Sequence, residues 1–497
     1  MINLPITGYA EGYYGRLLSW AERRKIVDTL QRLGLGSYYY APKEDPCHRL
    51  HWREPYSSLW HEEFNHFCAY AKDCGIRVVA GVAPGLDFDF ADFPDGEDLA
   101  HLVSKSQALL DDGADNISLL MDDIDADFDK RCGHFRSEGE AHASLANALG
   151  KALSKTPSKT PSKTPSKTPS KTPSKTPSKT PSKTPSKTPS KTPSKTPSKT
   201  LSKTLSKTLG KTLGKTLGKT LGKTLGKTER RTSSDALLPK SSVHPDNIIA
   251  TSVWVTPRIY ADELMVEDEQ YVPDFIKTLD AHHCVLYCGS DVVARSLDEN
   301  SAHALRKNTW RKNTINARIT DHVKHRVIIW DNLYANDYCP RRLFTGPWEM
   351  RNKLRDVLLN PTGMVHTDCL LLELMAVQMQ NLSVAESEQE DSMTLWRTVL
   401  HNHGVPEAFH ALAPFFYHPH FNDSDNTDLM TDTPAYDTDV FAAIEHCLWR
   451  WKTPLSREWY TFIFGLKHDL LTFTGQHARE RILKTQNHPL ARLLLKS

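Results

Sequence analysis

Short apolar stretches alternate with longer amphipathic ones along most of the chain. Eight apolar stretches predict buried strands, at residues 6–9, 37–41, 77–82, 117–121, 248–255, 284–288, 326–330 and 364–367. The segments between them, such as 20–34, 61–75 and 98–113, carry apolar residues at three- and four-residue spacing and end near a glycine, as helices do. Alternating strands and helices indicate a parallel sheet, and eight such units predict an α/β fold of the closed (β/α)8 barrel type. A doubly wound open sheet is the alternative.

The pattern changes near residue 375. Beyond it the strand rhythm is lost, and the segments 393–404, 440–452 and 458–484 have helical periodicity. We therefore expect a barrel domain over residues 1–375, interrupted by a repeat tract at 154–228, and a helical C-terminal domain over 376–497.

The repeat tract has a four-residue period, first K-T-P-S and then K-T-L-G, with 19 lysines and no acidic residue. Its proline-rich part is too poor in apolar residues to form a core, so we expect an extended, disordered coil. It follows the fourth predicted helix, which places it on the lower face of the barrel. It is either a basic arm that contacts polyanions or an expanded repeat tolerated in a harmless loop, and we favour the second interpretation.

Charge and cysteine usage limit the possible functions. Without those 19 lysines, 43 basic residues face 60 acidic ones, which leaves a formal charge of −17 and argues against a nucleic-acid substrate. The nine cysteines form no C-x-x-C pair, which argues against structural zinc and against a disulfide scaffold. The first residues do not resemble a secretory signal, and no run of 18 apolar residues occurs. We expect a cytoplasmic protein with no membrane contact and no cofactor.

Three aspartates, Asp122, Asp123 and Asp125, follow the predicted strand 117–121. A solvated turn or a helix cap would explain them if they stood alone. In a barrel, however, the active site lies on the loops after the strands. Polar clusters occur at six such ends: EGYYGR, APKED, APGLDFDF, MDDID, TPRIY and WDNLYANDY. Aromatic residues among them suit the C–H faces of sugar rings, and the acids and amides suit hydroxyl groups, so the pattern favours a carbohydrate-active barrel.

A family resemblance sharpens this interpretation. Six motifs, EGYYG (11–15), YAPKED (40–45), MDDID (121–125), PRIY (257–260), WDNLYANDY (330–338) and LLNPTG (358–363), together resemble the catalytic domain of the family 84 glycoside hydrolases. These are β-N-acetylglucosaminidases that include the O-GlcNAcases. The resemblance is colinear over residues 6–375, apart from the repeat tract. It implies a (β/α)8 barrel that removes terminal β-linked N-acetylglucosamine with retention of configuration and without a metal.

The resemblance also implies catalytic roles for two aspartates. In substrate-assisted glycosidases the 2-acetamido oxygen of the substrate attacks C1, so the protein supplies no nucleophile. By the match of MDDID, Asp122 would polarise the acetamido N–H as an oxazoline forms. Asp123 would protonate the leaving oxygen and then activate water. We expect the negative charge beside it to raise the pKa of Asp123 and keep it partly protonated. Asp125 is expected to cap or orient the loop.

Other family positions carry over to seven residues of this chain that would bind substrate: Gly12, Lys43, Tyr260, Trp330, Asn332, Asp337 and Asn360. Gly12 would admit the sugar close to the backbone, Lys43 and Asn360 would bind hydroxyl groups, and Trp330 would form a wall. Asn332 would bind the acetamido group and Asp337 the 4- and 6-hydroxyls, while Trp254 is expected in the core. The alternative function is a non-catalytic N-acetylglucosamine-binding barrel, and the natural substrate stays open among a glycoprotein, a cell-wall fragment and a free oligosaccharide.

Overall fold

The computed structural model describes residues 5–124, 128–155, 251–294, 296–298, 325–339, 341–352, 354–417 and 438–473. These residues belong to one compact unit of the chain. Asp125, the repeat tract from residue 156 onward and the chain beyond residue 473 lie outside the described residues. No helix within the described ranges is long and apolar enough to cross a bilayer.

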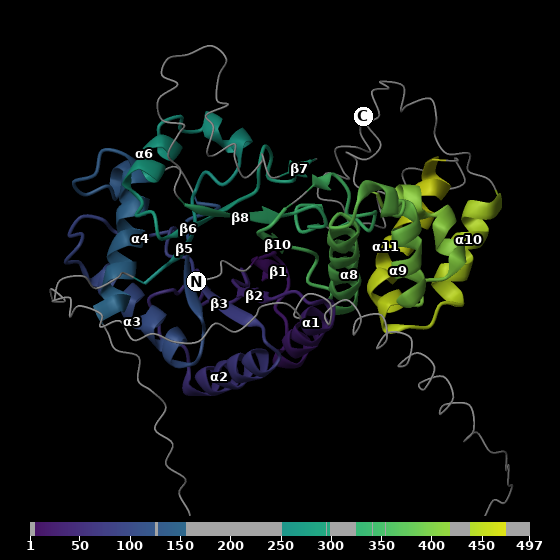
Figure 1. The fold of residues 1–497 in the computed structure, drawn as a ribbon, viewed down its shortest axis with the longest axis horizontal. Helices are drawn as coiled ribbons and strands as arrows, with labels where there is room; N and C mark the ends of the chain where they lie inside the picture. Colours follow the sequence, from purple (N-terminus) through teal and green to yellow (C-terminus); the bar gives the residue numbers. More distant parts are fainter. Residues whose placement is uncertain are drawn as a thin grey trace, which may run out of the picture. The chain divides into compact units, whose positions relative to one another are not determined.

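Eight parallel strands close into a barrel (Figure 1). They are β1 (Thr7–Glu11), β2 (Ser37–Tyr40), β3 (Arg77–Val82), β4 (Asn116–Leu120), β5 (Trp254–Thr256), β6 (Cys284–Tyr287), β8 (Arg326–Asp331) and β10 (Val357–Leu359). The barrel closes because β1 pairs with both the last strand and the second one. Thr7 of β1 is in register with Val357 of β10, and Gly8 is in register with Ser37 of β2. The predicted (β/α)8 barrel is confirmed, and the open sheet is excluded. Two further short strands, β7 (Leu297–Asp298) and β9 (Arg351–Asn352), pair with each other.

The helices that follow the strands surround the barrel (Figure 1). They are α1 (Trp20–Leu33), α2 (Ser58–Asp73), α3 (Glu97–Asp111), α4 (Glu138–Lys155), α6 (Tyr271–Thr278) and α8 (Val365–Asn381), with short 3₁₀ turns η1 (Phe128–Lys130) and η2 (Asp262–Val266) in the loops. The first helix shows how sequence sets its ends. Ser19 and Glu22 form a capping box at its start, and Gly34 at φ 72° ends it.

The eighth strand prediction was wrong. Residues 364–367 were expected to form it, but β10 occupies Val357–Leu359 and Val365 begins α8. The strand is only three residues long, too short to show a pattern of its own. The turn that ends it is held by Asp368 of α8, whose carboxylate accepts the backbone N–H groups of Thr362 and Gly363, each at 3.0 Å.

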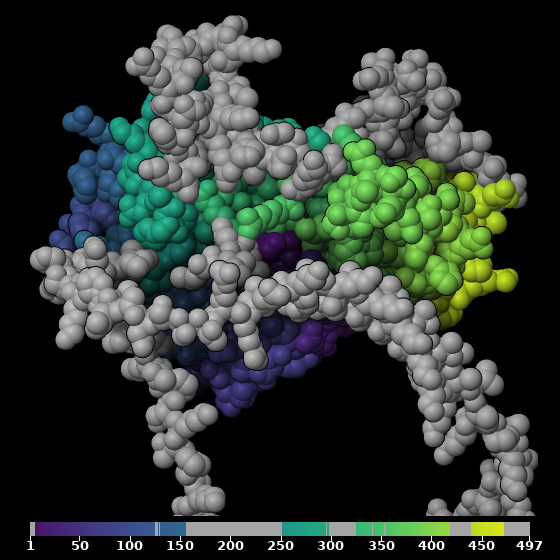
Figure 2. All heavy atoms as spheres, in the orientation of Figure 1, coloured from purple at the N-terminus to yellow at the C-terminus, as the bar shows by residue number. Residues whose placement is uncertain are grey.

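Within residues 382–417 and 438–473 the regular structure is also helical: α9 (Ser392–Asn402), α10 (Thr438–Trp449), α11 (Pro454–Phe473) and the 3₁₀ turns η3 (Glu386–Glu388), η4 (Glu407–Ala411) and η5 (Ala413–Phe415). Figure 2 shows their residues, coloured green to yellow, gathered on one side of the unit. Of these, α9 and α11 pack against α8, which runs across the predicted domain boundary at residue 375, so that boundary stays a prediction.

Two apolar layers hold the barrel. The inner layer fills the space between the strands and includes Tyr39, Trp254, Leu286, Ile328 and Leu358, all fully or nearly fully buried. The outer layer packs the strands against the helices. Trp254 lies in the inner layer, as expected. With the barrel filled by side chains, a ligand can enter only above the carboxyl ends of the strands.

Candidate active site

A pocket of about 610 Å³ opens at the carboxyl ends of the strands, within the size range of small-molecule sites. All nine residues predicted for the site line it: Gly12, Lys43, Asp122, Asp123, Tyr260, Trp330, Asn332, Asp337 and Asn360. Trp330 lies near the end of β8 and the other eight follow β1, β2, β4, β5, β8 and β10, so six separate strand ends contribute to one cavity. The structure therefore brings the predicted residues together, while their individual roles stay predictions.

Lys43 holds the two aspartates that follow β4. Its Nζ lies 2.5 Å from Asp122 Oδ2 and 3.6 Å from Asp123 Oδ2, and its side chain is 2% exposed. Asp122 is the more enclosed carboxylate, with 12% of its side chain exposed against 34% for Asp123. The second oxygen of Asp122, Oδ1, is buried and has no hydrogen-bond partner in the described part of the chain. A buried carboxylate oxygen without a donor is costly unless a ligand supplies one.

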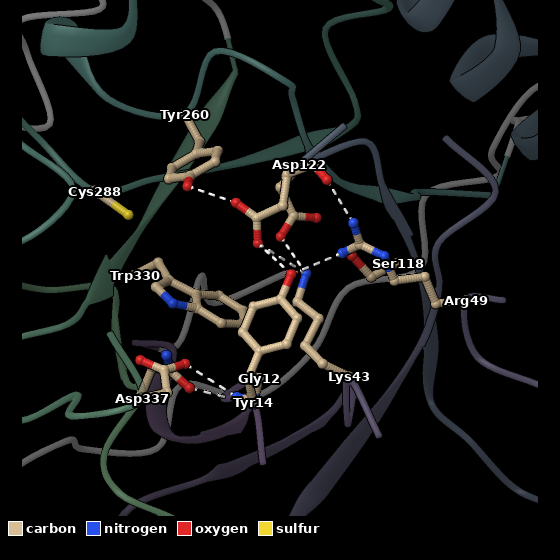
Figure 3. Close-up of polar contacts among 12 residues, drawn as sticks. Gly12, Tyr14, Lys43, Arg49, Ser118, Asp122, Tyr260, Cys288, Trp330 and Asp337 are labelled. Carbon is tan, nitrogen blue, oxygen red and sulfur yellow. Dashed lines mark hydrogen bonds and ion pairs between the residues drawn. The ribbon is translucent and has the colours of Figure 1, made fainter. Parts of the chain in front are cut away.

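Asp123 is held by three further side chains, those of Tyr14, Tyr260 and Arg49, which are labelled in Figure 3. Tyr14 donates to its Oδ2 and Tyr260 to its Oδ1, both at 2.8 Å, and Arg49 donates to its main-chain carbonyl at 2.5 Å. Its φ of 52° lies in the left-handed region, which costs a non-glycine residue roughly 1–3 kcal/mol. Such strain persists only where the surroundings enforce it, and here they fix the direction of a carboxylate in the pocket.

The expected protonation of Asp123 is corrected by these contacts. Burial raises the pKa of Asp123, but the Lys43 ammonium and the hydrogen bonds from Tyr14 and Tyr260 outweigh burial, so that the pKa falls below its usual value. The adjacent carboxylate does not dominate, because a cation lies between the pair. Without a ligand, Asp123 is therefore a carboxylate at neutral pH.

Gly12 and Trp330 shape the opposite wall. A Cβ atom on Gly12 would lie 2.3 Å from Trp330 Cζ2, so only glycine lets the β1 loop pass the indole. The Gly12 N–H donates to Asn360 Oδ1 at 3.2 Å. Asn360 Nδ2 and Trp330 Nε1 both donate to Asn332 Oδ1 at 2.9 Å, and Asn332 Nδ2 donates to the Val292 carbonyl at 2.9 Å. The Asn332 amide is thus engaged within the protein, and its acetamido-binding role stays a prediction.

Asp337 links two strand-end loops at the mouth of the pocket. Its Oδ2 accepts the Tyr14 N–H at 3.0 Å, and its Oδ1 accepts the Tyr338 N–H at 3.0 Å. Both tyrosines line the cavity and keep exposed surface there. Carboxylate oxygens at such a mouth suit sugar hydroxyls as additional donors.

Sequence reasoning missed several groups at the site. Tyr14 lay inside the quoted EGYYG motif without being singled out, and Arg49 lies just beyond YAPKED with no sequence signal. Cys288, Glu263 and Asp291 also line the pocket. One of the six quoted clusters, APGLDFDF, contributes no residue to the lining, because Asp87 instead binds Trp52 Nε1 at 2.7 Å and Arg53 at 2.6 Å.

One group within the described ranges has the spacing of a metal site. Potential ligand atoms of Asp280, His282 and His283 lie within 4.8 Å of one another, before β6 and therefore at the end of the barrel away from the pocket. His283 Nδ1 already accepts the Val253 N–H at 2.9 Å. The neutral ring then carries its proton on Nε2, so neither nitrogen has a free lone pair for a metal. This donor set does not fit an ion.

Comparisons with known proteins agree with the geometry. The family model described as beta-N-acetylglucosaminidase matches residues 7–171 and 240–416. Protein O-GlcNAcase of Rattus norvegicus and that of Mus musculus are each 23% identical over 416 residues, covering 81% of this chain and 33% of theirs. The chain thus spans about a third of the length of these curated relatives.

A solved structure extends the likeness to the fold. An O-GlcNAc hydrolase mutant from Thermobaculum terrenum superposes with a TM-score of 0.52 at 18% identity, covering 97% of this chain and 78% of that chain. Identity this low supports the fold alone. The family model, in contrast, matches well over half of the sequence. The protein therefore belongs to the β-N-acetylglucosaminidase family, family 84 of the glycoside hydrolases.

Proposed function

We propose that this protein is a retaining exo-β-N-acetylglucosaminidase of the O-GlcNAcase type, acting on terminal β-linked N-acetylglucosamine of a glycoconjugate or oligosaccharide. The observation that carries the proposal is the unpartnered, buried Oδ1 of Asp122 beside a second carboxylate in a sugar-sized pocket. An acetamido N–H is a donor of the kind this oxygen lacks.

The first chemical step forms an oxazoline. The acetamido oxygen of the substrate attacks C1. Asp122 accepts a hydrogen bond from the acetamido N–H, and this makes the acetamido oxygen more nucleophilic. The bond from C1 to the leaving oxygen breaks, and Asp123 gives that oxygen a proton. Asp123 must therefore be protonated in the complex. A sugar ring that covers it removes water and displaces hydroxyl donors, and both changes raise the pKa of a carboxyl group.

The second step reverses the role of Asp123. Now a carboxylate, it takes a proton from water, and the oxygen of that water attacks C1 from the face that the leaving group vacated. The oxazoline C–O bond breaks and the acetamido group is restored. Two inversions at C1 give net retention without a covalent bond to the protein.

The test compares an aryl β-N-acetylglucosaminide with the matching aryl β-glucoside, with and without a thiazoline that mimics the oxazoline. We expect turnover of the first sugar only, inhibition by the thiazoline, and loss of that inhibition in Asp122→Asn. Comparable turnover of both sugars, or a trapped glycosyl-aspartate, would overturn the substrate-assisted route. Tight binding of N-acetylglucosamine without aglycone release would instead favour the non-catalytic alternative.

Asp123→Ala supplies a second test of the assigned roles. Its rate should fall by about 10²-fold or more on a substrate with a poor leaving group, and far less on an activated aryl glycoside that needs little protonation. Equal losses on the two substrates would contradict the acid/base role.

A further inference from the structure

Arg49 lies beside the aspartate pair and is held by a fixed stretch of backbone. It is 8% exposed, in the loop after β2. The preceding residue, His48, ties this loop to the end of β3. The Ala83 N–H donates to the His48 carbonyl at 2.9 Å, and His48 Nδ1 donates to the Gly81 carbonyl at 2.9 Å. The guanidinium group therefore projects from an anchored position.

The Arg49 guanidinium contacts Asp123 in two ways, one direct and one through Tyr14, whose ring lies beside Arg49 in Figure 3. Nη2 donates to the Asp123 carbonyl at 2.5 Å. Nη1 donates to the Tyr14 hydroxyl at 3.1 Å, and that hydroxyl donates to Asp123 Oδ2 at 2.8 Å. The direct contact acts on a residue whose φ is 52°, a conformation that non-glycine residues keep only when neighbours enforce it.

We propose that Arg49 is a positioning residue for proton transfer: it holds Asp123 in the left-handed backbone conformation and, through Tyr14, directs its carboxyl group towards the leaving oxygen. The inference rests on the proposed acid/base role of Asp123. Arg49 itself touches no substrate in this scheme and is absent from the pocket lining. A misplaced carboxyl group harms the reactions that depend on protonation of the leaving group more than those that do not.

Charge gives Arg49 a second, measurable effect. The groups that face the Asp123 carboxyl are the cations Lys43 and Arg49, the hydroxyls of Tyr14 and Tyr260, the neighbouring Asp122 and the thiol of Cys288. Replacing Arg49 by a neutral residue removes a cation, and Tyr14→Phe removes a hydroxyl donor. Both changes raise the pKa of Asp123 in the enzyme without substrate. The basic limb of the pH profile of kcat/KM therefore moves to higher pH.

The experiment measures kcat/KM against pH for Arg49→Gln, Arg49→Lys and Tyr14→Phe on two aryl β-N-acetylglucosaminides, one with a good and one with a poor leaving group. Arg53→Gln is the matched control, because Arg53 lies in the same loop region but pairs with Asp87 and Asp98 outside the pocket. In Arg49→Gln we expect a loss of about 10²-fold at the plateau on the poor leaving group and less than about 5-fold on the good one. Arg49→Lys should recover part of the loss.

The outcomes separate this inference from the proposed function. A wild-type chain that fails to hydrolyse either substrate refutes the proposed function. A wild-type chain that is active, with Arg49→Gln losing equally on both substrates or keeping the wild-type basic limb, refutes the positioning role and leaves the function standing. If Arg49→Gln does not fold, Tyr14→Phe decides, since it removes a single hydroxyl: an unchanged leaving-group dependence and basic limb in that variant overturn the inference.

Discussion

The Lys43 ammonium lies 2.5 Å from the Asp122 carboxylate and is almost fully buried there. It also lies 3.6 Å from Asp123, so one cation offsets the repulsion of two adjacent acids. The sequence resemblance assigned Lys43 to a sugar hydroxyl. The structure shows it engaged with the aspartates, which gives it an electrostatic task whether or not it also binds sugar.

Lys43→Met should therefore change the pH profile as well as the rate. Removing the cation raises the pKa of Asp123, so the basic limb of kcat/KM moves to higher pH. The maximal kcat/KM of the profile should fall by at least about 10-fold, because two adjacent carboxylates without a cation repel each other and are poorly solvated in the pocket. Lys105→Met is the control, since Lys105 is also buried but donates to the Cys47 carbonyl outside the pocket. The profiles should be measured between about pH 2.5 and 7, because the lowered pKa of Asp123 places the basic limb of the wild type below the usual carboxyl range. Profiles that superpose on the wild type would contradict this electrostatic role.

Gly12→Ala tests how closely the pocket wall is packed. The added Cβ would lie 2.3 Å from Trp330 Cζ2, so either the indole or the β1 loop must move. We expect kcat/KM to fall by about 10²-fold, because a shift of about 1 Å at a reacting site has that order of effect. Gly36→Ala is the control, as its Cβ would meet nothing within 4 Å and its backbone needs no special conformation. Equal kcat/KM values for the two variants would show that Trp330 or the β1 loop can move without disturbing the reaction.

The barrel was predictable because its strands are apolar runs separated by capped helices. The eighth strand was missed because Val357–Leu359 is too short to show an apolar pattern. The β-branched residues Val365 and Thr367 are typical of strands, but here they belong to the first turn of a helix. Asn360 was still identified, because the LLNPTG motif carried it independently of any strand prediction.

The electrostatics of the site could not be predicted from the sequence in the same way. Asp122 stands next to Asp123 in the chain, so repulsion between them is visible in the sequence. The hydroxyl groups that help to lower the pKa of Asp123 belong to residues distant in the sequence: Tyr14 is 109 positions from Asp123, and Tyr260 is 137. Only the closed barrel brings them together, and motif reading does not give hydrogen-bond partners. Arg49 was missed for the same reason.

Glu373 of α8 should make stability depend on pH. Burial raises its pKa, but hydrogen bonds with His403 and Arg32 outweigh burial and lower the pKa to about 2. A folded pKa below the unfolded value of about 4.5 stabilises the protein above pH 4.5, and this contribution is lost as pH falls towards 2. Glu373→Gln should cost about 1 kcal/mol of unfolding free energy at pH 7, a small value because Arg32 is half exposed. Thermal melts from pH 7 to 3 should show the gap to wild type closing, and a constant gap would refute the linkage.

The C-terminal helices reach the pocket through the start of α8. That helix has no side-chain cap of its own, and Glu458 of α11 accepts the N–H groups of His366 at 3.0 Å and Thr367 at 2.7 Å. The next residue, Asp368, fixes the turn that follows Asn360. A change at α11 is thus connected to the Asn360 amide in the pocket lining through one helix terminus.

Glu458→Ala should lower the free energy of unfolding by about 1 kcal/mol, the usual cost of a lost helix cap, measured by urea denaturation. Because the turn after Asn360 loosens, KM for an aryl β-N-acetylglucosaminide should also rise several-fold while kcat changes little. Glu445→Ala is the control, since Glu445 forms a partly exposed ion pair with Lys467 between α10 and α11 and touches neither α8 nor the pocket. If stability falls in Glu458→Ala but KM stays at the wild-type value, α11 supports the barrel without positioning Asn360, which its own bonds to Gly12 and Asn332 and the Asp368 turn then hold in place.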